Sequence, residues 1–174
     1  MVHISTATVA ARFSEIQALV VDDDASVRKV VRALLTSLGV GTIWEAGDGV
    51  AGIEIVRKTA PDVIILDWEM PRLQGPGFMR MLRSPDTFPY PAVPVIMLTA
   101  HGEYSKVKEA ISVGVNEFLL KPVSSKGLLE RLVSVLFNPR PIVRKRGYYG
   151  PQPRTAGQLL GRSEWPTRDD VVML

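Results

Sequence analysis

The 174-residue chain contains no cysteine, which excludes disulfide bonds and metal sites built from thiolate ligands. It has no apolar run near the roughly 18 residues that a membrane-spanning helix needs. Its first fifteen residues also lack the basic-then-apolar order of a secretory signal peptide. We therefore expect a cytoplasmic protein that does not enter a membrane.

Net charge is small over most of the chain and positive only near its end. Residues 1–137 contain 14 Lys and Arg against 15 Asp and Glu, whereas residues 138–174 contain seven against three. This C-terminal segment also holds five prolines and four glycines. Because proline fixes φ and glycine weakens helices, the segment is predicted to be an extended basic tail and not a packed domain.

The tail at residues 138–174 is nevertheless rich in apolar side chains. These are Ile142, Val143, Tyr148, Tyr149, Leu159, Leu160, Trp165 and the final Val171, Val172, Met173 and Leu174. Interfaces favour Tyr, Trp and Arg, so we expect the tail to dock on another copy of the chain, which would give a homodimer, or on the kinase. Direct DNA binding is not expected, because the tail is too short for a helix-turn-helix module and its basic residues lack a fold.

The rest of the chain alternates strand and helix patterns. The expected strands are residues 19–21, 42–46, 62–67, 95–99 and 118–120, and the expected helices are residues 27–38, 48–58, 78–82, 103–113 and 125–137. Short β-branched runs separated by helices imply a parallel sheet with right-handed crossovers. Five such units predict a flavodoxin-like, doubly wound α/β domain over residues 14–137, preceded by an N-terminal extension at residues 1–13.

Two helix starts carry a capping signal. Asp24 precedes the first helix and Asp48 the second, and aspartate is a preferred N-cap residue. The spacing in the second helix predicts that Val50, Ile53 and Val56 face the sheet together with Ile55.

Charged residues follow three of the buried apolar runs. Asp22, Asp23 and Asp24 come directly after residues 19–21, Asp67 ends the run at residues 63–66, and Lys121 follows residues 118–120. Ligands of such sheets gather at the carboxyl ends of the strands. The sequence therefore predicts a site for a divalent cation and a phosphoryl group at this edge.

These residues also carry a family resemblance. Leu19-Val20-Val21-Asp22-Asp23, Asp67-Trp68-Glu69-Met70-Pro71, Leu98-Thr99-Ala100 and Lys121-Pro122 occur in the order and spacing of the receiver domain of bacterial response regulators. The resemblance covers about residues 14–137. It implies a single-domain response regulator that accepts a phosphoryl group on Asp67 from a sensor histidine kinase or a histidine phosphotransfer protein.

The resemblance also implies a Mg²⁺ cofactor and a phosphoacceptor that is not an enzyme in the ordinary sense. Asp23 and Asp67 would bind the ion directly, Asp22 through water, and Glu69 through its backbone carbonyl. Lys121 would contact one phosphoryl oxygen, with the Lys121–Pro122 peptide bond cis as in the family. Asp67 itself would be the nucleophile, since carboxylates are known to form aspartyl phosphates.

The same resemblance assigns a switch and two tuning positions. Thr99 would bind another phosphoryl oxygen and rearrange together with Phe118, which stands where the family usually carries a switch aromatic. Glu69 and His101 lie two residues beyond Asp67 and Thr99, where receivers tune the lifetime of the phosphorylated state. Glu69 replaces the common asparagine, and Gln74 stands where the family often has aspartate.

Three other functions remain open on the sequence. Asp22 to Ser26 resembles the opening motif of haloacid-dehalogenase-type phosphatases, with Asp22 as nucleophile, but the acidic pair that such enzymes need later is found only at Asp169-Asp170. No cap insertion fits either. The chain could instead be a phosphate-shuttling intermediate of a longer relay, or a non-catalytic interaction module with a structural metal.

Overall fold

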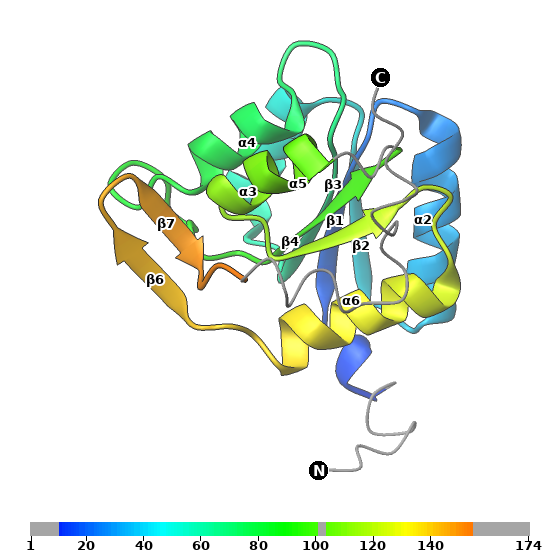
Figure 1. Ribbon diagram of the computed structural model, residues 1–174. Coiled ribbons are helices and arrows are strands. Elements are labelled where there is room, and N and C mark those ends of the chain that lie inside the picture. The colour runs from blue at the N-terminus through cyan, green and yellow to red at the C-terminus, as the bar shows by residue number, and fades with distance from the viewer. Residues whose placement is uncertain (1–10, 101–103, 155–174) are drawn as a thin grey trace.

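Five parallel strands form the centre of the domain (Figure 1). The computed structural model describes residues 11–100 and 104–154. The strands are β1 (Gln17–Val21), β2 (Thr42–Ala46), β3 (Val63–Asp67), β4 (Val95–Thr99) and β5 (Glu117–Leu120), and their order in the sheet is β2-β1-β3-β4-β5. This confirms the predicted flavodoxin-like class, and it places β1, β3 and β4 in the middle of the sheet.

Helices cover both faces of this sheet. They are α2 (Ala25–Ser37), α3 (Gly49–Thr59), α4 (Gly75–Leu82), α5 (Tyr104–Ser112) and α6 (Ser125–Phe137). Alternate strand residues point to opposite faces. Ile64 and Met97 pack with residues of α3, α4 and α5, whereas Ile65 and Ile96 pack with residues of α2 and α6. All residues of β3 and β4 are buried, which explains their continuous apolar sequence.

Both predicted N-caps are present. The Asp24 carboxylate accepts a hydrogen bond of 2.7 Å from the Ser26 N–H, and the Asp48 carboxylate accepts one of 2.9 Å from the Ala51 N–H. These backbone hydrogen bonds hold the pKa of each carboxyl below its ordinary value. The two aspartates therefore remain charged caps at neutral pH.

Two details of the helices differ from expectation. Val50 was predicted to face the sheet but is 45% exposed. An α-helix turns by about 100° per residue, so the side chain of Val50 points about 120° away from that of the buried Val56. Helix α4 begins at Gly75, three residues before the predicted start at Phe78. Pro76 suggested a loop, yet the first turn of a helix tolerates proline because its N–H has no partner there.

The beginning of the C-terminal tail forms an antiparallel hairpin that the sequence analysis did not predict. Strand β6 (Ile142–Lys145) pairs with β7 (Tyr148–Pro151) across a turn at Arg146 and Gly147. Gly147 has a φ of 76°, which glycine adopts readily. Figure 1 shows the hairpin beside the domain after the chain has left α6. Within the described ranges, no helix is long and apolar enough to cross a membrane.

Candidate functional site

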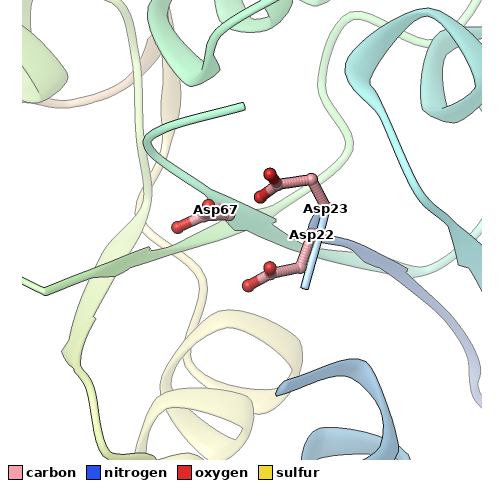
Figure 2. Close-up of side chains that lie close together, drawn as sticks. All are labelled: Asp22, Asp23 and Asp67. Carbon is pink, nitrogen blue, oxygen red and sulfur yellow. The ribbon is translucent and has the colours of Figure 1, made fainter. Parts of the chain in front are cut away.

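Three aspartates meet at the carboxyl end of the sheet (Figure 2). Asp22 and Asp23 follow β1, and Asp67 is the last residue of the neighbouring strand β3. One carboxylate oxygen from each residue lies within 4.8 Å of the others. Asp22 is fully buried and Asp67 is 5% exposed, whereas Asp23 is exposed. The cluster is thus anchored in the core and open to solvent beside Asp23.

A lysine ammonium group bridges two of these carboxylates. Lys121 Nζ lies 2.9 Å from Asp22 Oδ2 and 3.0 Å from Asp67 Oδ1. Its backbone N–H donates a 2.9 Å hydrogen bond to the Thr99 carbonyl, which fixes the end of β5 against the end of β4. The Lys121–Pro122 peptide bond is cis, as the resemblance implied.

Burial and neighbouring charges shift the pKa values of Asp67 and Lys121. Removal from water raises the pKa of Asp67, and the negative charge of Asp22 adds to the rise, while Lys121 opposes it. Burial disfavours the charged form of Lys121, but its contacts with Asp22 and Asp67 outweigh this and raise its pKa. With the three carboxylates ionised, one ammonium does not neutralise them. This excess negative charge and the oxygen donors fit Mg²⁺, which prefers carboxylate oxygens and water.

The aspartate cluster forms the floor of an open depression. Its remaining lining is supplied by Asp24, Trp68, Glu69, Met70, Pro71, Gln74, Thr99, Ala100, Lys106 and Lys121. Thr99 ends β4 and is 4% exposed. The exposed Glu69 carboxylate accepts a 2.7 Å hydrogen bond from Lys106 Nζ of α5. The depression therefore combines clustered carboxylate oxygens, a fixed ammonium group and a hydroxyl, the kinds of group that phosphoryl-transfer sites use.

Residues 18–133 match the family model described as the response regulator receiver domain. The chain belongs to this family. It is 33% identical over 114 residues to chemotaxis protein CheY-3 of Vibrio cholerae, covering 66% of this chain and 86% of that protein. It is 34% identical over 119 residues to the chemotaxis protein CheY homolog of Campylobacter jejuni, covering 68% and 90%.

A solved structure agrees with this assignment. The structure of chemotaxis protein CheY4 of Vibrio cholerae superposes with a TM-score of 0.63 at 32% sequence identity, covering 70% of this chain and 98% of that one. The acidic cluster of Asp22, Asp23 and Asp67 is typical of the Mg²⁺ site of receivers. The chain is thus a two-component signalling receiver, a phosphoacceptor module and not a classical enzyme.

The receiver fold brings most of the predicted site residues together. Asp22, Asp23, Asp67, Thr99 and Lys121 share the depression with Glu69 at its rim. Phe118 lies elsewhere: it is paired with Met97 in the sheet, whereas Thr99 is paired with Leu120. His101 falls outside the described residues. The roles assigned to these residues from the family remain predictions.

Two receiver residues near the site were missed by the sequence analysis. Arg28 of α2 donates a 2.7 Å hydrogen bond to the Asp22 carbonyl and so holds the acidic loop against the helix. It stands one turn into a helix that starts directly after this loop, a position that could have suggested the contact. Lys106 pairs with Glu69 across 37 positions of sequence, and no local pattern signals such a contact.

Gly75 permits a close approach of α4 to the end of β3. A Cβ at this position would lie 2.9 Å from the Asp67 carbonyl oxygen and 3.1 Å from Trp68 Cα. We expect Gly75→Ala to displace the end of β3 and to lower the free energy of unfolding by about 1–3 kcal/mol. Phosphorylation of Asp67 should also slow, measured as the initial rate of label uptake.

Gly77→Ala in the same helix is the control. Its Cβ would meet only Leu73 Cδ1 within 3 Å, the end of a flexible side chain. Alanine is also the better helix former, by about 1 kcal/mol. Equal loss of stability and rate in both variants would show that the contact beneath Asp67 is not what matters.

Proposed function

We propose that this receiver accepts a phosphoryl group on Asp67 from a sensor histidine kinase or a histidine phosphotransfer protein, in a Mg²⁺-dependent reaction. The observation that carries the proposal is the contact of Lys121 with Asp67 and Asp22 beside a third carboxylate. The fixed ammonium group lowers the repulsion between this almost buried carboxylate and an anionic donor, and a bound Mg²⁺ would offset the negative charge that remains.

The transfer is a displacement at phosphorus. An Asp67 oxygen attacks the phosphorus atom, the P–N bond to the donor histidine breaks, and the imidazole keeps the electron pair. Asp23, Asp67, the Glu69 carbonyl and, through water, Asp22 would hold Mg²⁺, which would neutralise charge on the phosphoryl oxygens. Lys121 keeps its contact with Asp22 and turns from Asp67 to one phosphoryl oxygen. Thr99 donates its hydroxyl to another.

Hydrolysis returns the chain to its starting state. Water attacks the phosphorus, the bond to the Asp67 oxygen breaks, and inorganic phosphate leaves. In the phosphorylated state Thr99 and Phe118 rearrange and change which proteins the domain binds, as a population shift between two states. Signalling through protein–protein contacts in the cytoplasm is part of the proposal, as is a homodimer.

The phosphatase alternative is disfavoured by the surroundings of its nucleophile. Asp22 is fully buried, its Oδ1 accepts from the Asp24 N–H at 2.9 Å, and its Oδ2 accepts from Lys121. Both Asp22 and Asp67 line the depression, but Asp67 is 5% exposed and has only Lys121 as a side-chain ion-pair partner among the described contacts. A role as a relay intermediate would use the same aspartate and differs only in the acceptor that follows.

The proposal is tested on the full chain with acetyl phosphate and Mg²⁺. Intact-mass spectrometry should show the gain of one phosphoryl group, which hydroxylamine removes and which peptide mapping places on Asp67. Chelation of the metal should abolish the gain. A chain that stays unmodified with acetyl phosphate and with a panel of phosphorylated histidine kinases would contradict the proposal.

The lifetime of the phosphorylated state should depend on Glu69 and His101. The Glu69 carboxylate adds negative charge beside the attacking water and is held aside by Lys106. We expect Glu69→Asn, His101→Ala and Lys106→Ala each to change the dephosphorylation rate several-fold, measured as loss of label after donor removal. Lys108→Ala, in the same helix as Lys106, is the control. Unchanged decay in all three variants would remove the tuning role.

A further inference from the structure

Residues 138–154 fold back onto the receiver domain, and we call this segment the strap. Its backbone packs tightly against the end of α5. A Cβ on Gly114 would lie 2.9 Å from the Tyr149 carbonyl oxygen, and one on Gly150 would lie 3.0 Å from Gly114 Cα. Such an approach of two main chains is possible because neither glycine carries a side chain.

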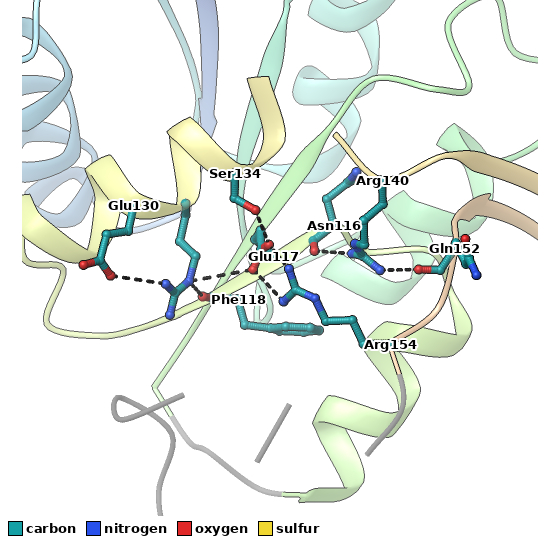
Figure 3. A network of polar contacts seen from close by, with 9 residues as sticks. Asn116, Glu117, Phe118, Glu130, Ser134, Arg140, Gln152 and Arg154 are labelled. Atoms are coloured by element: carbon teal, nitrogen blue, oxygen red, sulfur yellow. Dashed lines mark hydrogen bonds and ion pairs between the residues drawn. The ribbon is translucent and has the colours of Figure 1, made fainter. Parts of the chain in front are cut away.

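Three arginines attach the strap to the domain, and two of them, Arg140 and Arg154, are drawn in Figure 3. Arg140 donates to the Asn116 carbonyl at the start of β5 and to the Gln152 carbonyl of the strap itself. Arg144 forms an exposed ion pair with Asp86, in which Arg144 Nη2 lies 3.1 Å from Asp86 Oδ1 and 2.8 Å from Asp86 Oδ2. Arg154 makes two hydrogen bonds to the Glu117 carboxylate, one of them 2.9 Å long.

Glu117 is the most buried of these anchors. It is 2% exposed, and its carboxylate also accepts a 2.7 Å hydrogen bond from Ser134 and lies 3.9 Å from Arg131 Nε. Arg131 Nε in turn donates a hydrogen bond of 2.8 Å to the Phe118 carbonyl. A buried carboxylate is stable only where charges and donors surround it, so Arg154 is an integral part of this environment.

The strap also covers the neighbouring aromatic residue. A small hollow is lined by Ile111, Val115 and Phe118 from the domain and by Arg140, Tyr148 and Arg154 from the strap. Phe118 is 6% exposed and belongs to the same apolar cluster as Met97 and Trp68, the residue that follows Asp67. Packed side chains therefore connect the residues that the strap covers with the end of β3, where Asp67 lies.

We infer that the strap is an autoinhibitory segment, which covers the face built from α5, β5 and α6 in the unphosphorylated chain and leaves it when Asp67 is phosphorylated. The inference rests on the proposed function, because its trigger is occupation of the Asp67 site. A protein partner that presents arginine to Glu117 and an apolar group to Phe118 gains access only after release.

Two features make this docking reversible. Glu117 keeps Ser134 and Arg131 as partners when Arg154 leaves, and the Arg144–Asp86 pair is exposed, where such pairs contribute little. Movement of Phe118 during the switch would remove the ring on which the strap rests. Because coupling between two sites is reciprocal, release of the strap must favour occupation of the Asp67 site by the same factor.

The test follows amide hydrogen exchange of residues 142–151 in the full chain, with beryllofluoride and Mg²⁺ as the phosphoryl mimic. Exchange in this segment should rise at least several-fold when the mimic binds. Arg154→Ala should raise exchange without the mimic and should tighten beryllofluoride binding, read from the fluorescence of Trp68, by a matching factor. Arg146→Ala, at the exposed turn of the hairpin, is the control and should change neither quantity.

The possible failures are distinguishable. If beryllofluoride leaves the amides around Asp67 and the Trp68 signal unchanged, the proposed function fails and the inference fails with it. If beryllofluoride binds but strap exchange stays constant, the strap is a permanent part of the fold and only the inference is overturned. Should Arg154→Ala not fold, Arg140→Ala replaces it, because Arg140 is only half-buried and donates to the Asn116 carbonyl of the domain. This variant should shift exchange and affinity the same way, and no shift overturns the inference.

Discussion

Replacement of Asp67 by asparagine is expected to abolish phosphorylation while leaving the fold intact. The amide lacks the nucleophilic carboxylate oxygen, so label uptake from acetyl phosphate should fall below about 1% of the wild-type value. The variant should also lose most of the thermal stabilisation that Mg²⁺ gives the wild-type chain, because one of three clustered carboxylates is gone. Uptake near the wild-type level would place the acceptor elsewhere.

Asp67→Asn is also expected to change the thermal stability of the chain in the absence of Mg²⁺. Burial raises the pKa of Asp67 above its ordinary value of 3.8, so folding disfavours the ionised form. The resulting stabilisation is present below pH 3.8 and is lost as the pH rises through the pKa of the folded state. At pH 7 ionised Asp67 is therefore unfavourable for folding, and Asp67→Asn should melt at a higher temperature than wild type in the absence of Mg²⁺.

Asp24→Asn is the matched control for both experiments. Asp24 is the N-cap of α2, and asparagine caps helices about as well as aspartate. Its carboxylate lines the depression but does not belong to the three-aspartate cluster. Phosphorylation and the response to Mg²⁺ should persist in this variant. Loss of label uptake there would show that overall charge, and not Asp67, controls the reaction.

Arg83→Met is expected to cause the largest loss of stability among the substitutions considered. Arg83 is 7% exposed, and burial lowers its pKa to about 10, so it stays charged at pH 7. It donates hydrogen bonds of 2.6 to 3.0 Å to the carbonyls of Pro91, Val93 and Gly114 and to Asn116 Oδ1. Methionine cannot supply any of these hydrogen bonds, and within the described residues only Asn116 Oδ1 keeps another donor, the Val95 N–H. The free energy of unfolding should therefore fall by about 3–5 kcal/mol in urea titrations.

Arg80→Met, in the last turn of α4 just before Arg83, tests whether the position matters and not the residue type. Arg80 pairs with Glu109 at 3.3 Å, and the two side chains are 63% and 44% exposed. Exposed ion pairs contribute only about 0.2–1 kcal/mol. A similar loss of stability in both variants would mean that the buried hydrogen bonds of Arg83 do not hold α4, the following loop and β5 together.

The fold and the floor of the site could be predicted because their signals are local. Each strand of the sheet is a short apolar run, and Asp22, Asp67 and Lys121 stand at the ends of three such runs. Parallel topology then brings these ends to one edge, so sequence order alone predicts which side chains meet. The capping aspartates Asp24 and Asp48 were predictable for the same reason.

Contacts made across long stretches of sequence could not be predicted in this way. Lys106 reaches Glu69 from another helix, and Arg154 reaches Glu117 from a segment whose prolines and glycines suggested only an extended chain. In the hairpin the strands are four residues each, too short for a clear alternation of apolar and polar residues. Val50 shows a smaller limit, since apolar character does not decide which way a residue faces.

The position of β5 at the end of the sheet gives the strap a second consequence. An edge strand carries backbone groups without a neighbouring strand, and such groups invite pairing with other chains. The strap carries Pro139, Pro141, Pro151 and Pro153, which have no N–H to offer to a sheet, so it can shield this edge without extending it. The strap, which leaves for signalling, therefore also protects the edge of β5 from pairing with other chains. After its release this edge is exposed until a partner binds in place of the strap.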